Sequence, residues 1–261
     1  VVHLTAMAGR LGVNIDLKEF DKLTHDLPMI IDLKPSGTGY MEDLYKAGGS
    51  IRIFNELKDF LHLDAKFVNG NSIGDEIQKA STRKQDIITT KDKPVFKGGS
   101  IAVLSGTLAP GSAIIKQSAA SSNLLVHEGK AVVFENLEDL ANRVDSEELD
   151  VSKDDVLVLK SIGPKGGPGM PEAGLIPIPK KLARQGVKDM VRVSDGRMSG
   201  TASGTIVLHV TPESYEKGPL AIVQNGDLIK LDVPNRKIDL LISEDEMNKR
   251  ILLLSDDKTK R

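Results

Sequence analysis

The spacing of apolar positions is helical in the first quarter of the chain and typical of strands in most of the rest. Over residues 1–62, apolar side chains recur every three or four positions, which predicts a series of helices separated by glycine and polar residues. The helices are expected to start at residue 1, at Leu17 behind the capping residue Asp16, near Tyr40 and at Ser50.

A polar stretch over residues 67–93 marks the expected domain boundary. Ser72 is placed to cap a short helix inside this stretch, and His62, just before it, is expected in solvent near the end of the fourth helix. We therefore expect a helical segment over residues 1–66, a linker over 67–93 and a second domain over 94–261.

The second domain is a succession of short β-rich runs with few helices between them. Strands at this spacing predict a closed or nearly closed barrel. Helices are expected near residues 137–144 and 243–252, and Gln224-Asn225-Gly226-Asp227 predicts a hairpin. The expected strands are residues 101–104, 113–116, 131–134, 156–159, 190–193, 205–210, 220–223, 228–233 and 238–242.

Composition narrows the class of protein. The formal net charge is −2 and aromatic residues are only 3%, without tryptophan, so neither a nucleic-acid partner nor a membrane surface is expected. No run approaches the roughly 18 apolar residues of a membrane span. There are no cysteines, which excludes a disulfide scaffold, and because nothing points to secretion we expect a cytoplasmic protein.

Two glycine-rich turns are unlike packing segments. The first turn, residues 163–172, reads Gly-Pro-Lys-Gly-Gly-Pro-Gly-Met-Pro-Glu, and the second turn, residues 194–204, reads Ser-Asp-Gly-Arg-Met-Ser-Gly-Thr-Ala-Ser-Gly. Glycines let the backbone approach a ligand, and prolines limit the freedom that glycines introduce. A short helix over residues 179–185 and a strand over 190–193 are expected between them, so the second turn leaves a strand end, where catalytic groups are often held.

The polar side chains of the two turns are suited to catalysis. Glu172 offers a carboxylate, a hard oxygen ligand of the kind that Mg²⁺ prefers. The second turn offers Ser199 and Thr201 with Arg197 nearby, and a serine becomes an effective base only where a metal, a cation or a neighbouring base lowers its pKa. Either turn alone is equally typical of a connection inside a β domain. Together they favour a functional site.

Further motifs, in one order along nearly the whole chain, resemble the C-terminal part of the dihydroxy-acid and sugar-acid dehydratase family, which includes the 6-phosphogluconate dehydratases. Several motifs in order are more specific than any one of them. Besides the two turns they are Asp32-Leu33-Lys34-Pro35-Ser36-Gly37, Tyr40-Met41-Glu42-Asp43-Leu44, Leu108-Ala109-Pro110, Ala113-Ile114-Ile115-Lys116, His127-Glu128-Gly129-Lys130-Ala131-Val132-Val133-Phe134-Glu135, His209-Val210-Thr211-Pro212-Glu213, Gly218-Pro219-Leu220-Ala221 and Gly226-Asp227.

The resemblance implies an α/β protein in which the helical end of an N-terminal α/β domain is followed by a swivelling β/β/α barrel domain. It implies a hydro-lyase that converts a 2,3-dihydroxy carboxylic acid to a 2-keto acid, with an Fe–S cluster as Lewis acid on the leaving 3-hydroxyl and Mg²⁺ near the carboxylate and 2-hydroxyl. Homodimers or homotetramers are implied by the same analogy.

Roles follow from the resemblance, residue by residue. Glu172 is similar to the glutamate that binds Mg²⁺, Ser199 falls at the serine that removes the C2 proton, and Thr201 matches a threonine near the cluster. Arg197 beside the serine is expected to bind substrate. Lys116, at a strand end, is either a second substrate-binding group or simply solvated.

Cysteine thiolates hold the cluster in such enzymes, so this cysteine-free chain cannot carry it alone. The first helix begins at residue 1 without a capping residue, and the chain ends without the further segment usual in the family. We therefore expect part of a protein about twice as long. The missing N-terminal domain would supply the cysteines, the other Mg²⁺ ligands and a modified lysine, and the sequence leaves 2Fe–2S and 4Fe–4S clusters open.

The substrate is expected to be a sugar acid such as xylonate or arabonate, because the run after Glu172 is closer to that branch. The alternative is the dihydroxy acid of branched-chain amino-acid biosynthesis. One departure bears on this choice: Gly106-Thr107-Leu108-Ala109-Pro110-Gly111 replaces the Gly-Asn-Leu-Ala-Pro-Asp common in the family. Two other classes stay open, namely a ligand-binding barrel without catalysis and one subunit of a split enzyme.

The remaining polar candidates have plain structural interpretations. His127 and His209 are expected in packing roles, with His209 facing opposite to Leu208 and Val210 along a strand. The five histidines show no metal-ligand spacing, so a zinc site is not expected. The Asp32–Gly37 loop is open between a site loop and an ordinary connection.

Overall fold

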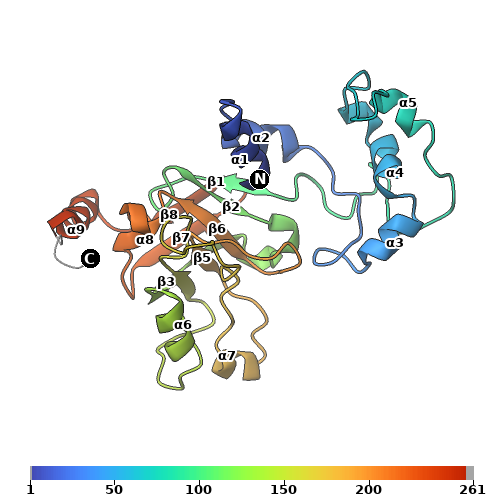
Figure 1. Cartoon of the computed structure of the whole chain (residues 1–261). Coiled ribbons are helices and arrows are strands. Elements are labelled where there is room, and N and C mark those ends of the chain that lie inside the picture. Colours follow the sequence, from blue (N-terminus) through green and yellow to red (C-terminus); the bar gives the residue numbers. More distant parts are fainter. Residues whose placement is uncertain (1, 257–261) are drawn as a thin grey trace. The chain divides into compact units, whose positions relative to one another are not determined.

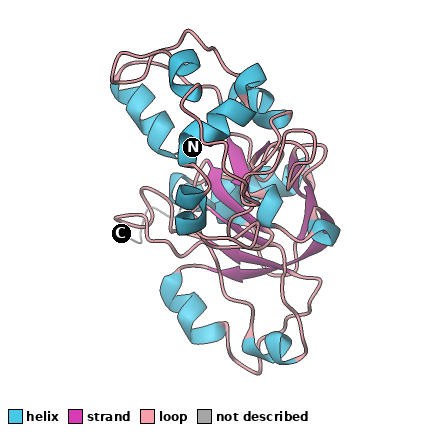
Figure 2. Cartoon of the chain, turned by 90° about the vertical axis from the view of Figure 1, so that its right-hand side faces the viewer, coloured by secondary structure: helices cyan, strands magenta, loops and turns pink. Residues whose placement is uncertain are grey.

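The computed structural model describes residues 2–256, which divide into two compact units between Ser100 and Ile101. The strands gather in the second unit, whereas the first is built of helices and loops (Figures 1 and 2). Among the helices of residues 2–256, none has the length and apolar character that crossing a membrane requires.

The first unit contains the expected helices. Asp16 caps α2 by accepting a hydrogen bond from the Lys18 backbone N at 2.8 Å, and Ser72 caps α5 in a capping box with Asp75. The capping of the first helix at residue 1 lies outside the described residues. The helices are α1 (Val2–Arg10), α2 (Leu17–His25), α3 (Met41–Lys46), α4 (Gly49–Glu56) and α5 (Ile73–Ile77), with a 3₁₀ turn at Lys58–Phe60.

Two details of the first unit differ from or add to the sequence analysis. Helix α4 ends at Glu56, so the exposed His62 lies beyond a 3₁₀ turn rather than near the end of a longer helix. Residues 67–93, expected as a linker, lie in this unit, where Ile88 is buried against Ile30. The predicted domain boundaries themselves stay a prediction.

The second unit is a barrel-shaped eight-stranded sheet, as the spacing of the strands predicted. The strand order is β1-β2-β6-β5-β4-β3-β7-β8, and a parallel bridge between Ser105 and Lys237 joins the chain after β1 to the start of β8. The strands are β1 (Ala102–Leu104), β2 (Ser112–Ile115), β3 (Val126–Phe134), β4 (Val156–Leu159), β5 (Arg192–Ser194), β6 (Ile206–Thr211), β7 (Leu228–Asp232) and β8 (Lys237–Leu240).

Strand β3 changes partner along its length. Its first half pairs antiparallel with β7 and its second half pairs parallel with β4. The connection from β3 to β4 carries the helix expected near residues 137–144, α6 (Leu137–Arg143), which is capped by Asn136. The central strands β3 to β6 therefore run parallel, and antiparallel strands flank them on both sides.

One predicted strand is wrong. Residues 220–222 lie in the short helix α8 (Pro219–Ile222) and Val223 follows it, so the turn at Gln224–Asp227 joins a helix to β7 and makes no hairpin. A four-residue apolar run does not distinguish the two structures by itself. Pro219, with its fixed φ, sits in the first turn of the helix, and Leu220 and Ile222 are buried.

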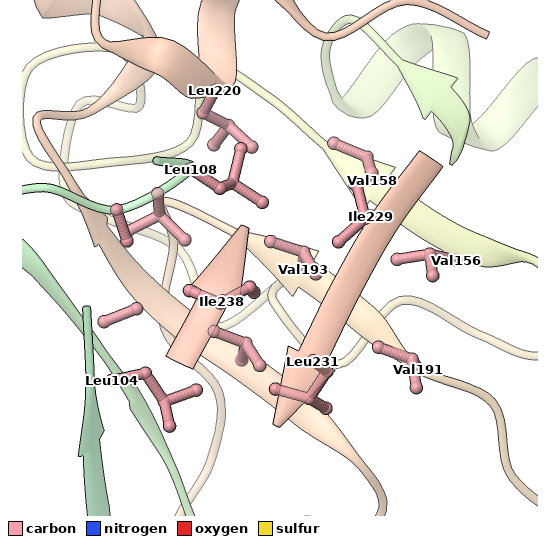
Figure 3. Close-up of a cluster of buried hydrophobic side chains, with 14 of the residues drawn as sticks. Leu104, Leu108, Val156, Val158, Val191, Val193, Leu220, Ile229, Leu231 and Ile238 are labelled. Carbon is pink, nitrogen blue, oxygen red and sulfur yellow. The ribbon is translucent and has the colours of Figure 1, made fainter. Parts of the chain in front are cut away.

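Two layers of apolar side chains bury the barrel wall. One layer fills the interior, where alternate residues such as Val156, Val158, Ile229 and Leu231 converge (Figure 3). The other layer covers Leu157 and Leu159 with side chains from α6, from the residues that follow α6 and from α7 (Lys180–Arg184). Parallel strands buried on both faces carry continuous apolar runs, which explains the sequence Val-Leu-Val-Leu of β4.

The segment over residues 106–111, which departs from the family pattern, lies where the barrel closes. The Thr107 hydroxyl accepts a hydrogen bond from Leu240 N at 2.9 Å, and the Thr107 backbone N donates to Asp239 at 2.8 Å. Gly106 is needed beside it, because a Cβ there would collide with the carbonyl oxygen of Ile238. Thr107 thus has a structural use in this chain. The C-terminal helix α9 (Glu244–Asp256) packs Met247, Ile251 and Leu254 against the interior layer.

Candidate active site

The two glycine-rich turns leave the same edge of the barrel. Strands β4 and β5 are neighbours and run parallel, with Leu157 opposite Arg192 and Leu159 opposite Ser194. The first turn follows β4 and the second turn follows β5, so both extend from the carboxyl ends of adjacent parallel strands. In α/β sheets, ligands bind at such ends.

Arg197 joins the two turns. Its Nε donates to the carbonyl oxygen of Met170 at 2.7 Å, and its Nη1 lies 3.0 Å from Oε1 of Glu172. The backbone reinforces this junction, since Gly174 N donates to the Arg197 carbonyl at 2.7 Å. Glu172 and Arg197, predicted from separate turns, are therefore in direct contact, and both side chains stay partly accessible, at 47% and 39%.

The hydroxyl groups of the second turn lie together. Ser199 Oγ and Thr201 Oγ1 are 3.1 Å apart, within hydrogen-bonding distance. Lys116, just after β2, donates from Nζ to the carbonyl oxygen of Gly200 at 3.0 Å. Burial lowers the pKa of Lys116 from its ordinary value. The sequence left Lys116 open between a substrate group and a solvated strand end, and the structure places it against the turn that carries Ser199.

Two buried carboxylates hold the turns in place, and the sequence analysis assigned neither of them a role. Asp195 accepts hydrogen bonds from Ile162 N at 3.1 Å and Ser214 N at 2.9 Å, and from the Ser214 hydroxyl. Glu213 accepts from the backbone N atoms of Lys165 and Gly166. Both belong to motifs that carry the resemblance, and only that membership signalled them.

A buried ion pair fixes the chain between the turns. Arg192 donates to the carbonyl oxygens of Leu175 and Ile176 and to Asp189, with the guanidinium and carboxylate 5% and 10% exposed. Burial alone would raise the pKa of Asp189, but hydrogen bonds from Ser121 and Thr205 outweigh it and lower that pKa. The carboxylate therefore stays charged and keeps its six donors together.

His209 does not follow the alternation of its strand. Its φ is +54°, in the left-handed region, at an irregularity in the pairing of β2 with β6. Its backbone N donates to Gly196 of the second turn at 3.1 Å. The side chain lines a cavity of about 480 Å³ together with Lys165, Asp195 and Glu213. Burial lowers the pKa of His209, and the charge of Arg197 adds to the effect.

The implied metals fit this chain to different degrees. Glu172 is an accessible carboxylate, and Mg²⁺ commonly takes only one or two protein carboxylates, so Glu172 fits as one ligand. Within residues 2–256, no three or more histidine, aspartate or glutamate side chains are grouped to hold a metal. The chain has no cysteine. An Fe–S cluster therefore has no thiolate ligand here.

Comparison with known proteins places this architecture in a family. The chain belongs to the dihydroxy-acid/6-phosphogluconate dehydratase family: the model of the family's C-terminal domain matches residues 86–260, and the model of its N-terminal domain matches residues 1–76. The resemblance predicted from the motifs is confirmed, and with it membership in a family of dehydratases.

Individual relatives include both branches of the family. The chain is 45% identical over 253 residues to an L-arabinonate dehydratase of Rhizobium leguminosarum bv. trifolii and 47% identical over 254 residues to an L-arabonate dehydratase of Azospirillum brasilense. It is 40% identical over 253 residues to a dihydroxy-acid dehydratase of Carboxydothermus hydrogenoformans. These alignments cover 96% of the chain but 44–45% of each relative, so the chain spans less than half their length.

Proposed function

We propose that this chain forms the barrel domain and part of the N-terminal domain of a hydro-lyase that dehydrates a sugar acid, such as arabonate or xylonate, to a 2-keto-3-deoxy acid. The observation that carries the proposal is the contact between the two turns, which brings Glu172 and Arg197 within 3.0 Å. Greater identity to relatives named for arabonate than to one named for dihydroxy acids supports a sugar acid. A branched-chain dihydroxy acid is the second candidate.

The proposed base is Ser199. It takes the proton from C2 of the substrate, the hydroxyl at C3 leaves as water with one added proton, and the resulting enol becomes the 2-keto acid. A serine alkoxide needs stabilisation, and a hydrogen bond donated to the charged form lowers a pKa. Thr201, 3.1 Å from Ser199, is placed to donate that bond, and Lys116 and Arg197 add positive charge to the same turn.

Two cofactors belong to the proposal. Glu172 would be one ligand of Mg²⁺, which supplies charge stabilisation for the carbanion that forms beside the carboxylate. The cysteines of an Fe–S cluster would lie outside these 261 residues, in the remainder of the N-terminal domain. A cytoplasmic location and a homodimer or homotetramer complete the proposal.

The experiment that tests the function uses the full-length enzyme. It measures 2-keto acid release from L-arabonate, D-xylonate and 2,3-dihydroxyisovalerate. Turnover of a sugar acid supports the proposal, and exclusive turnover of dihydroxyisovalerate selects the second candidate. Turnover of none of these acids argues for a ligand-binding barrel without catalysis.

Substitution of the proposed base tests its role separately. Ser199→Ala should lower kcat by about 10²- to 10⁴-fold, the usual contribution of a positioned base, without changing metal or cluster content. Ser203→Ala, at an exposed serine of the same turn, is the matched control and should keep normal activity. Activity retained in Ser199→Ala removes Ser199 from the role of base.

Glu172→Gln tests the proposed Mg²⁺ ligand. Loss of one carboxylate should raise the half-saturating Mg²⁺ concentration, because a neutral amide oxygen is a weaker ligand for a hard cation. The control is Glu148→Gln at an exposed position. A metal titration that is the same in wild type and Glu172→Gln would contradict the assignment.

A further inference from the structure

Glu213 occupies an anion site built from the backbone of the first turn. Glu213 comes just after β6 in the chain, and the residue is only 8% exposed. Its carboxylate oxygens accept hydrogen bonds from Lys165 N at 2.9 and 3.2 Å and from Gly166 N at 3.1 Å. Successive backbone N–H groups in a turn form a concave site for an anion, and here the anion is the protein's own carboxylate.

The sequence of the turn is adapted to this carboxylate. Gly163 has no side chain where it faces Glu213, and a Cβ at that position would collide with Oε2. Phosphate-binding turns have a similar glycine-rich composition. In this chain the N–H groups of Lys165 and Gly166 are already used by Glu213, so the first turn is held from within.

Glu213 also connects the first turn to the second. The next residue, Ser214, donates from its backbone N to Asp195 of the second turn at 2.9 Å, and its hydroxyl accepts a hydrogen bond from Ser161 N at 2.7 Å. The segment that leads into the first turn is therefore bound to residues 213–214 and to Asp195 at once. None of these contacts involves the exposed side chains of the site.

The first turn is consequently fixed at both ends. Glu213 binds its beginning at Lys165 and Gly166, and Arg197 binds its end at Met170 and Glu172. Met170 has a φ of +45°, a conformation that non-glycine residues rarely adopt. Because such a conformation persists only where neighbouring contacts determine it, release of one end should let Glu172 move.

We propose that Glu213 is a positioning residue that holds the metal-binding carboxylate of Glu172 in place through the backbone of the first turn. This inference rests on the proposed function only for the metal that Glu172 binds. It assigns a use to the Thr-Pro-Glu end of the His209–Glu213 motif.

The test compares three variants of the full-length protein. Glu213→Gln keeps the shape of the side chain but presents an amide NH₂ to one of the two N–H donors. Gly163→Ala keeps the carboxylate and displaces it. The matched control is Glu216→Gln, because Glu216 pairs with the side chain of the same Lys165, is 44% exposed and does not touch the turn's backbone N–H groups.

Two measurements are made on each variant. Hydrogen exchange followed by mass spectrometry reports the protection of amides in residues 163–172. Binding of Mn²⁺ alone, followed by electron paramagnetic resonance, reports metal affinity without turnover. We expect faster exchange in this segment and about 10- to 100-fold weaker Mn²⁺ binding in Glu213→Gln and Gly163→Ala, as for other residues that orient metal ligands, and neither change in Glu216→Gln.

Several results would overturn the proposal. Unchanged exchange would show that Glu213 does not hold the turn, and faster exchange with unchanged Mn²⁺ affinity would reduce Glu213 to a structural residue. Equal effects in Glu216→Gln would show a general perturbation. If Glu213→Gln does not fold, the exchange and Mn²⁺ binding of Gly163→Ala decide whether the proposal holds. Wild-type protein that binds Mn²⁺ but dehydrates no sugar acid would refute the proposed function and leave this inference testable.

Discussion

At the scale of single residues, exposure separates two kinds of polar group in the site. Asp195 and Glu213 are 1% and 8% exposed and bind backbone N–H groups, whereas Glu172 and Arg197 are partly accessible and can meet a ligand. Buried polar atoms must be satisfied within the protein, so the first pair supports the turns. The second pair, together with Ser199 and Thr201, carries the chemistry that we propose.

Burial of His209 predicts how the stability of the protein depends on pH. Burial lowers its pKa below the ordinary 6.5, so the folded protein binds a proton less readily than the unfolded chain. Its contribution to stability is fully present above pH 6.5 and is lost as pH falls from there toward the folded pKa. Wild type should therefore lose more thermal stability than His209→Gln between about pH 8 and 5, the range in which histidine titrates.

The measurement is the melting temperature across that pH range, and His62→Gln, at an exposed histidine, serves as control. Equal pH dependence in wild type and His209→Gln would show that His209 does not contribute.

The exposed residues of the candidate site stand out in the sequence, but the residues that support them do not. Glu172, Arg197, Ser199 and Thr201 belong to turns whose composition is unusual in itself. Asp195 and Glu213 act on backbone groups 33 and 48 residues away along the chain. No local pattern reports such contacts, because they depend on β4, β5 and β6 being neighbours.

At the scale of elements, the sequence predicted best where the signal is local. The caps Asp16 and Ser72 were both predicted, since each binds a backbone N–H two or three residues away. Helix α8 was missed because its four residues carry too little periodicity. The order of the strands could not be predicted either, because β3 pairs with β7, which lies about a hundred residues further along the chain.

The buried ion pair between the two turns should contribute strongly to stability. Arg192→Ala should lower the free energy of unfolding by about 3–5 kcal/mol, because it leaves Asp189 buried without its cation and removes two carbonyl contacts near Ile176. Chemical denaturation measures the loss. Arg184→Ala, which breaks an ion pair whose side chains are 69% and 68% exposed, should change stability little. Similar losses in both variants would contradict the prediction.

At the scale of the whole molecule, the two units differ in how much apolar surface they bury. The first unit has a small cluster around Ile30, Ala47, Leu57 and Ile88, whereas the second has two extensive layers on either side of its sheet. Stability grows with the fraction of surface that a domain buries. The barrel should therefore be the stable part of this chain.

Separate expression tests this difference. Residues 101–261 should unfold in one cooperative transition in urea, and residues 1–100 should show no comparable transition. Circular dichroism and tryptic digestion would report both. Cooperative unfolding of residues 1–100 alone would contradict the prediction.

The bridge between Ser105 and Lys237 has a consequence for association between chains. An open sheet exposes unpaired amide and carbonyl groups along its two outer strands, and these recruit strands from other molecules. Here the bridge and the hydrogen bonds of Thr107 bring the first strand of the sheet to its last. Deletion of β8 would uncover β7 and the chain after β1, and the shortened protein should aggregate by adding strands where the intact barrel does not.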